Sequence, residues 1–194
     1  MYYAASGTVS GPARSGLPIT LTGPLGTEMT TTNMSGDFSF DDLIDGDYTI
    51  VATSQPGVRI TPNSISFTLA DSNVEDLDFV SQESYTLSGM VSGDVMAGVL
   101  MTLGGDDDDV TLSGPDGFYQ FEGLLPGSYT VEAWEPGYDM SPSMIPVTIV
   151  NDGVDGIDFM SMATSYVITA SAGPNGIISP AGDTIVEYDG TVTY

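Results

Sequence analysis

Carboxylates are the side chains with which this chain could do chemistry, because it contains no histidine, cysteine or lysine. Calcium takes about six to eight oxygen ligands, so clustered carboxylates and amides favour that ion over other metals. Two clusters offer such oxygens, and their members are Asp106, Asp107, Asp108 and Asp109 in the first and Asp71, Asn73 and Glu75 in the second. These residues require no cofactor, and calcium is the ion that they could bind.

The absent residue types exclude several classes of function. Without His or Cys there is no Ser-His-Asp or Cys-His nucleophile and no ordinary zinc site, and without Lys there is no Schiff base. Arg14 and Arg59 stand against 27 acidic residues, giving a net charge of −25. Nucleic acid would be repelled by that charge, and no apolar stretch is long enough to insert into a membrane as a helix.

The chain contains two imperfect copies of one unit. "GTVSG" at residues 7–11 returns as "GMVSG" at 89–93, and "GDFSFDDLIDGDYTIVA" at 36–52 returns as "GFYQFEGLLPGSYTVEA" at 117–133. The offset between the copies drifts from 82 to 80 residues along the chain. Such single-residue length changes are tolerated in loops, so the two copies are expected to share one fold.

Each copy has short apolar alternations separated by Gly, Pro, Asn and Asp, with no helical period, which predicts an all-β unit. In the first copy strands are expected near residues 4–10, 17–22, 28–32, 37–40, 47–53, 64–70 and 75–80. Seven short strands predict a two-sheet Greek-key β-sandwich. The expected domains are a first sandwich repeat over residues 1–82, a second over 83–162 and a partial third β unit, a hairpin, over 163–194.

Several segments carry a family resemblance: the opening "SGTVSG", the "TLTG" strand, "SGDFSF" followed by "LIDGDYTI", and the closing "DLDF". Over residues 3–80 and 84–161 the chain resembles carboxypeptidase-regulatory-like and collagen-adhesin B-type domains. That resemblance implies a transthyretin-like (prealbumin-like) sandwich and a tandem array in a secreted or surface protein, but no particular activity. Collagen-adhesin domains often contain a Lys–Asn isopeptide bond, which this chain cannot form without lysine.

The third piece, "YVITASAGPNGIISPAGDTIVEYDGTVTY", departs from the repeat. It resembles part of a small bacterial surface repeat in which "GPNGxISP" turns between two strands, and we expect the array to continue beyond it. A two-stranded piece is too small to fold alone, so Ile168, Ile177 and Ile185 need cover. We expect the hairpin to dock within its own chain; addition to a neighbouring molecule's sheet edge is the alternative.

The acidic clusters also have a plainer interpretation. The aspartate run aligns with residues 24–29, a connection between two expected strands, where a solvated hairpin loop suits Asp. Four consecutive side chains cannot all point at one ion. The second cluster begins like an EF-hand loop, but Asp76 stands where glycine is required and Gln82 at the twelfth position. Asp78 and Asp158 recur beside a core phenylalanine, and alternation turns them outward as structural residues.

Trp134, the only tryptophan, follows Ala133 and is predicted to face outward, with Tyr138 four residues further on. Exposed aromatic rings can stack on sugars, so these two residues form a candidate carbohydrate-binding site. The alternative is that Trp134 covers the domain junction or packs under the third segment.

Together these features predict a non-catalytic structural or adhesive β-sandwich array at a bacterial or archaeal cell surface or outside the cell. Its role would be that of a stalk, a spacer or a filament subunit, and the alternative is a carbohydrate-binding module. Expected partners are other domains or subunits of a surface assembly, including self-association by strand addition, or a polysaccharide. An enzyme is not expected, because a glycosidase needs two carboxylates held in a cleft.

Overall fold

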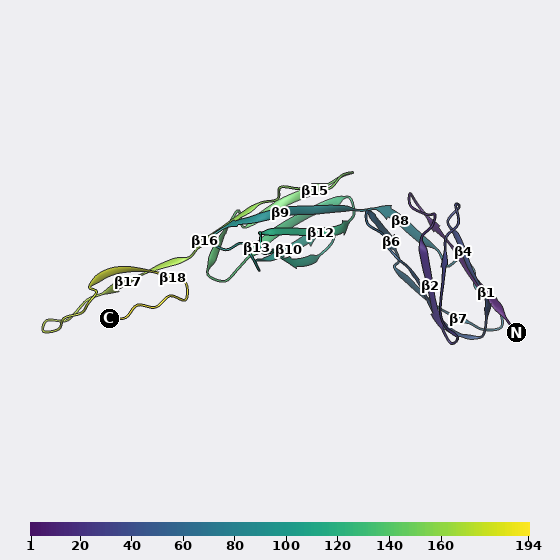
Figure 1. The fold of residues 1–194 in the computed structure, drawn as a ribbon, viewed down its shortest axis with the longest axis horizontal. Helices are drawn as coiled ribbons and strands as arrows, with labels where there is room; N and C mark the ends of the chain where they lie inside the picture. The colour runs from purple at the N-terminus through teal and green to yellow at the C-terminus, as the bar shows by residue number, and fades with distance from the viewer. The chain divides into compact units, whose positions relative to one another are not determined.

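The computed structural model describes all residues from 1 to 194 and consists of strands, turns and loops (Figure 1). The chain divides into two compact units, the first made of residues 1–85 and 123–125 and the second of residues 86–122 and 126–194. None of its elements is a helix with the length and apolar character needed to cross a bilayer. The predicted all-β fold class is confirmed.

The first unit is a sandwich of two four-stranded sheets, ordered β4-β1-β8-β6 and β3-β2-β5-β7. Its strands are β1 (Tyr3–Ser10), β2 (Pro18–Gly23), β3 (Gly26–Thr31), β4 (Asp37–Leu43), β5 (Gly46–Ala52), β6 (Val58–Thr61), β7 (Ser64–Leu69) and β8 (Phe79–Glu83). Only β2 and β3 follow one another within a sheet; every other connection passes to the opposite sheet.

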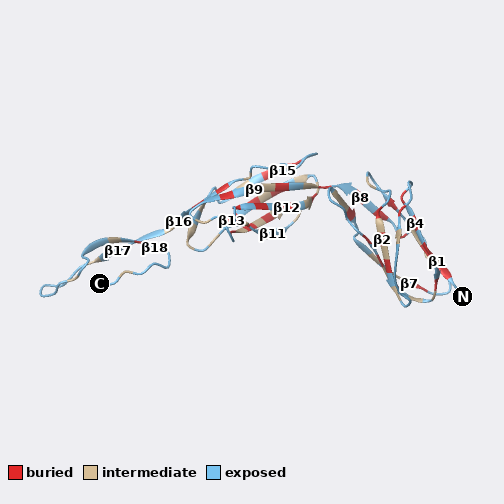
Figure 2. Ribbon diagram, in the orientation of Figure 1, coloured by how far each residue is buried: buried red, intermediate tan, exposed pale blue.

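Alternating side chains build the core of this sandwich. On β5, Tyr48, Ile50 and Ala52 are buried while their neighbours Asp47 and Val51 are exposed, as the repeat pattern predicts. Figure 2 shows buried residues recurring along the strands of both units. Because successive strand residues point to opposite faces, each sheet presents one apolar face to its partner and one face to solvent.

The sandwich has one strand more than the sequence predicts. Residues 58–61 form β6, which pairs with β8, and a run of four residues is at the lower limit for which alternation indicates a strand. The last strand also begins at Phe79, not at residue 75. The segment before it runs beside β1 and makes only an isolated bridge, between Ala5 and Val74.

The second unit repeats this architecture strand for strand, with sheets ordered β12-β9-β16-β14 and β11-β10-β13-β15. Its strands are β9 (Tyr85–Gly93), β10 (Leu100–Gly105), β11 (Asp109–Leu112), β12 (Phe118–Leu124), β13 (Gly127–Trp134), β14 (Tyr138–Ser141), β15 (Met144–Ile149) and β16 (Phe159–Ala163). The internal sequence repeat is therefore a repeat of structure.

The same aromatic arrangement occupies both cores. In the first unit the ring of Phe38 lies 6.1 Å from that of Phe79, and in the second Tyr119 lies 6.3 Å from Phe159. The two positions differ by one hydroxyl group, which Tyr119 donates to the carbonyl oxygen of Ile157. Burial raises the pKa of Tyr119, and the charge of Asp158 raises it further.

The last segment forms an antiparallel hairpin of β17 (Ser165–Ala170) and β18 (Gly182–Glu187). The expectation that it packs its apolar residues against its own chain is wrong: Ile168, Ile177 and Ile185 are exposed, and only Val186 is buried. Thr164 links the hairpin to the second sandwich, since its N–H donates to the Gly137 carbonyl and its own carbonyl accepts from Tyr188. The Tyr188 ring lies against Gly137. A two-stranded ribbon has no second layer with which to bury both faces.

Replacing Tyr119 with Phe, the residue at the matching position of the first unit, tests the buried hydroxyl. Losing this hydrogen bond is expected to lower the free energy of unfolding of the second unit by about 1 kcal/mol at pH 7. Because the folded-state pKa of Tyr119 is raised, the stabilisation from its neutral form is present below pH 10, the ordinary tyrosine value, and is lost as pH rises above it.

Urea denaturation at pH 7, 9 and 11 (roughly below, near and above the ordinary tyrosine pKa), followed by Trp134 fluorescence, measures both effects. The Tyr119→Phe variant should lose less stability than the wild type between the two higher pH values. Equal losses would show that Tyr119 does not contribute to the alkaline sensitivity of this unit.

Candidate functional site

The first and last strands of each unit lie side by side and run parallel. Val9 pairs with Phe79 in the first unit, and Val91 pairs with Phe159 in the second. Each sandwich therefore receives the chain on one strand and releases it on that strand's neighbour. We call this pairing the terminal-strand clamp; it comprises residues 4–10 with 73–81, and 86–93 with 154–161.

Backbone hydrogen bonds extend each clamp beyond the short ladder. In the first unit the Ser6 N–H donates to the Val74 carbonyl at 3.0 Å, and the Leu77 N–H donates to the Ser6 carbonyl at 3.2 Å. In the second unit Ser88 takes the place of Ser6, with the corresponding bonds at 2.9 and 3.2 Å. The irregular segment before the last strand is thus tied to the first strand along its length.

A carboxylate completes each clamp. Asp78 Oδ1 accepts the backbone N–H of Thr8 at 2.9 Å and the Thr8 hydroxyl at 2.7 Å. Asp158 Oδ1 accepts the Met90 N–H at 2.9 Å. Hydrogen bonds to a charged acceptor are stronger than neutral ones. The prediction that these two aspartates are outward-facing structural residues is confirmed, but their partners on the first strand could not be read from alternation.

A buried serine lies at the other end of each clamp. The Ser81 hydroxyl donates to the Ser10 carbonyl at 2.9 Å and accepts the Ala13 N–H at 3.1 Å. Ser161 lies 3.0 Å from the Ser92 carbonyl and accepts the Val95 N–H at 2.9 Å. Sequence reasoning missed both serines, although they recur at a fixed offset two residues after the closing phenylalanine.

The repeated glycines of "GTVSG" and "GMVSG" allow the close approach of the two segments. A Cβ atom on Gly7 would lie 2.2 Å from the Leu77 carbonyl oxygen, and one on Gly89 would lie 1.9 Å from that of Ile157. No side chain fits at such distances. Glycine is needed here because another backbone passes directly over it.

The aspartate run lies in the turn that joins β10 to β11, as its alignment with residues 24–29 predicts. Its carboxylates accept backbone hydrogen bonds: Asp106 from Ser128 at 2.8 Å, Asp107 from Asp108 at 3.2 Å and Asp109 from Val110 at 2.8 Å. They cap the hairpin and support the neighbouring strand.

The second predicted calcium cluster is also engaged with its own chain. Asn73 Oδ1 accepts the Ala4 N–H at 2.9 Å, which makes it part of the first clamp, and Asp71 lies 3.3 Å from the Tyr3 hydroxyl. Glu75 is exposed. Nowhere in the chain do three or more acidic side chains gather in an arrangement that could hold a metal ion, and calcium binding stays a prediction.

The two predicted sugar-binding aromatics lie on different sheets. Trp134 ends β13 and is exposed, as alternation predicts, whereas Tyr138 begins β14 in the opposite sheet and is half-buried. Tyr138 pairs with Ala163 and lies two residues from Met140, which pairs with the buried Ser161, so it is on the inward-facing side of its strand. The structure does not bring the two rings together.

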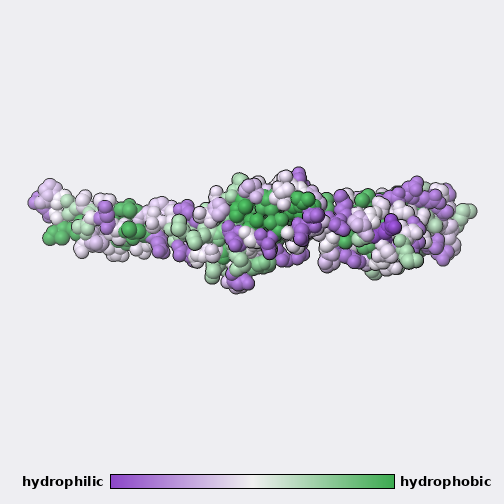
Figure 3. Space-filling model, turned by 90° about the horizontal axis from the view of Figure 1, so that it is seen from above, coloured by the Kyte–Doolittle hydropathy of each residue, from purple (hydrophilic) through white to green (hydrophobic).

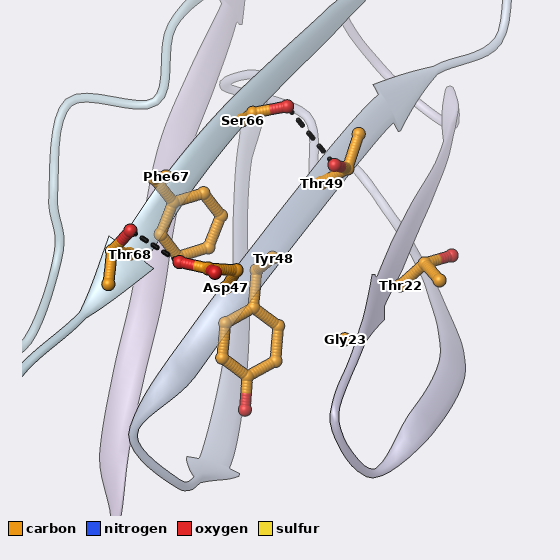
Figure 4. Close-up of a pocket in the computed structure, with 8 residues that line it drawn as sticks. All are labelled: Thr22, Gly23, Asp47, Tyr48, Thr49, Ser66, Phe67 and Thr68. Carbon is orange, nitrogen blue, oxygen red and sulfur yellow. Dashed lines mark hydrogen bonds between the residues drawn. The ribbon is translucent and has the colours of Figure 1, made fainter.

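An open depression on the first unit is lined by hydroxyl groups and two stacked rings (Figure 4). The rings of Tyr48 and Phe67 lie 5.6 Å apart and nearly parallel. Its polar groups bond to one another, since Thr68 donates to Asp47 at 2.6 Å and Thr49 shares a hydrogen bond with Ser66 at 3.1 Å (Figure 4). These groups form cross-strand links.

Comparison with known proteins agrees with this topology. Residues 82–163 match the family model of the second β-sandwich domain of BOS complex subunit NOMO1-like proteins. The chain contains two tandem β-sandwich domains, and the second of them matches this family. The resemblance drawn from the repeated motifs is confirmed.

The related curated proteins are much longer than this chain. It is 34% identical over 102 residues to the mouse carboxypeptidase N catalytic chain, covering 50% of this chain and 21% of that protein. It is 29% identical over 187 residues to serine-aspartate repeat-containing protein D of Staphylococcus aureus strain Newman, covering 79% and 14%. With protein F of Staphylococcus epidermidis the identity is 31% over 189 residues, covering 81% and 11%.

Similar solved structures include bacterial pilins. A streptococcal ancillary pilin shares 17% identity with a TM-score of 0.43, covering 84% of this chain and 63% of that one. A minor pilin of Streptococcus agalactiae shares 15% identity with a TM-score of 0.39, covering 87% and 100%. TM-scores below 0.5 do not establish a shared arrangement of the domains.

Calcium and magnesium are expected to raise the melting temperature equally, and only at millimolar concentrations. Divalent cations relieve the repulsion within a chain of net charge −25, while three of the four carboxylates of the aspartate run, those of Asp106, Asp107 and Asp109, already accept backbone N–H groups. Thermal unfolding at increasing concentrations of each cation measures the response. Stabilisation by micromolar calcium alone would show a specific site that this geometry does not suggest.

Proposed function

We propose that this chain is a non-catalytic, tension-bearing β-sandwich array of a secreted or cell-surface protein, acting as a stalk, spacer or filament subunit. The terminal-strand clamp is the observation that carries this proposal. The aligned staphylococcal proteins support it, because the two-sandwich stretch makes up only 14% and 11% of their length. A module used in this way belongs to a longer protein.

The geometry of the clamp matches a mechanical role. Tension along the chain enters each unit at the start of its first strand and leaves at the end of its last strand. Because these strands are parallel neighbours, such tension slides one along the other. The inter-strand hydrogen bonds then lie across the pulling direction and must break together, whereas an antiparallel pair pulled from one end separates bond by bond.

The clamp does not depend on a covalent cross-link. With no cysteine and no lysine, the chain can form neither a disulfide nor a Lys–Asn bond. Asp78 and Asp158, together with the bridging serines Ser81 and Ser161, supply non-covalent ties between the same two strands. A sandwich held in this way can unfold under load and refold without breaking a covalent bond.

Single-molecule pulling on the second unit tests this function, and the absence of cysteine permits site-specific attachment. Handles at Ser84→Cys and Thr164→Cys shear the clamp, whereas handles at Pro136→Cys and Thr164→Cys peel β14 from β16, since Tyr138 pairs with Ala163. We expect a clearly higher unfolding force in the shearing geometry. A lower or equal force there would contradict the proposed role.

The Asp158→Ala variant tests the carboxylate within the clamp. Removing one charge-assisted hydrogen bond should cost about 1 kcal/mol and accelerate unfolding under shear by up to about fivefold. Asp155→Ala is the matched control, because Asp155 is exposed and lies three residues away on the same segment. If both variants unfold at the same rate, Asp158 does not contribute to mechanical resistance.

The exposed hairpin distinguishes a spacer from a subunit. Its apolar residues Val167 and Ile185 are 62% and 73% exposed, and each of its two strands has one unpaired edge. Such edges recruit strands from other chains. The full chain should therefore self-associate at high protein concentration and moderate salt, and a chain ending at Thr164 should remain monomeric, as measured by sedimentation. A full chain that stays monomeric would favour the spacer.

A further inference from the structure

One outer face of the second sandwich is apolar, although a face exposed to solvent would be expected to be polar. It is the outer face of sheet β11-β10-β13-β15, and Figure 3 shows broad apolar surface over this unit in the view drawn. We call it the apolar sheet face, and its members are Leu100, Val110, Leu112, Trp134 and Met144.

Strand register places these side chains next to one another. Leu112 pairs with Leu100, and Leu100 pairs with Trp134, so the three form one row across three strands. Leu112 is 60% exposed and Trp134 is 61% exposed. Val110 and Met144 lie in the adjacent row, on the first and last strands of the sheet. Contiguous apolar surface of this kind marks interaction sites in soluble proteins.

The first unit shows that the fold does not require this face. Its corresponding row consists of Thr31, Pro18 and Thr53 at the positions of Leu112, Leu100 and Trp134. Both units bury equivalent inner residues and carry the same clamp, yet only the second has leucines and a tryptophan in this row. The apolar row is therefore separable from folding.

Charge restricts what can cover the face. From Thr86 to the end, the chain contains no Lys, Arg or His. Glu132 lies within the face, between Thr102 and Met144. At one end of the face, a Cβ atom on Gly104 would lie 3.7 Å from Asp108 Oδ1. An occupant that brings cations would find carboxylates in and beside the apolar row, and Trp134 offers an aromatic face to a cation as well.

We propose that the apolar sheet face is a docking surface for a polypeptide segment that carries Lys or Arg beside apolar side chains. Apolar residues of the partner cover the row of Leu112, Leu100 and Trp134, and its cations pair with Glu132 and Asp108. A second copy of this chain fits less well, because it would add further negative charge. A polysaccharide fits less well, because the face contains a single aromatic ring.

Trp134 allows binding to be read directly, since the only tryptophan of the chain lies in the face. The full chain is titrated with three short synthetic peptides, in which leucine alternates with lysine, serine with lysine, or leucine with glutamate. We expect the leucine–lysine peptide to bind and shift Trp134 emission to the blue. The serine–lysine peptide should bind at least about tenfold more weakly, and the leucine–glutamate peptide should not bind.

Variants taken from the first unit supply the controls. Leu112→Thr installs the residue of the matching position and should weaken binding of the leucine–lysine peptide about fivefold, since roughly half a leucine side chain is no longer covered. Met29→Thr, on the corresponding face of the first unit, should leave the affinity unchanged. Circular dichroism of both variants checks that they fold.

Several outcomes overturn the proposal. An unchanged affinity in Leu112→Thr would show that the peptide binds by charge elsewhere on the acidic surface. Equal binding of the leucine–glutamate peptide would remove the charge argument. A blue shift with soluble cello-oligosaccharides but not with the leucine–lysine peptide would assign the face to sugars, and a blue shift that follows protein concentration alone would assign it to a second copy.

Discussion

The parallel pairing of the first and last strands is the constraint on which each sandwich depends. In the first unit it joins strands β4 and β1 to strands β8 and β6, and in the second it joins β12 and β9 to β16 and β14. The paired segments are about seventy residues apart in the chain. Contacts of such sequence separation form only after the intervening loop entropy has been lost. Gly7 and Gly89 must be glycine, and Ser81 and Ser161 must be polar although buried, because this pairing brings a second backbone over them.

Most of the fold could be predicted from the sequence because the chain contains two copies of the same strand pattern. Alternation in β5 and β13 identified the inward-facing residues, and the repeated turn residues marked where strands end. Short strands and strand boundaries could not be predicted where the local sequence pattern is weak. Strands β6 and β14 have four residues each, which is the lower limit for recognising a strand by alternation. Residues 75–78 resemble the start of a strand, although they form an irregular segment held by β1. Only the partner strand decides its conformation.

The candidate site was harder to predict, because its members are recognised by what they contact. Asn73 belongs to the cluster predicted to bind calcium, yet its side chain caps the backbone of Ala4. Asp106 belongs to the other cluster and supports Ser128. The same acidic and amide residue types bind either an ion or a backbone amide, so residue type alone cannot distinguish the two roles. Position in the fold distinguishes them. The prediction for the hairpin over residues 165–187 was wrong for a related reason. The sequence shows that its apolar side chains need a partner surface, but not which surface that is.

The two units share what faces inward and differ in what faces outward. Packing and strand pairing fix the inner residues, since a change of one methylene in a filled core is felt by all its neighbours. The outer face of sheet β3-β2-β5-β7 or β11-β10-β13-β15 has no such neighbours within the unit, so Thr31 and Leu112 can occupy the same place in the same fold. Under the proposed roles, this separation lets every unit of a tandem array transmit tension through the same pair of strands, while a single unit carries a surface for recognition.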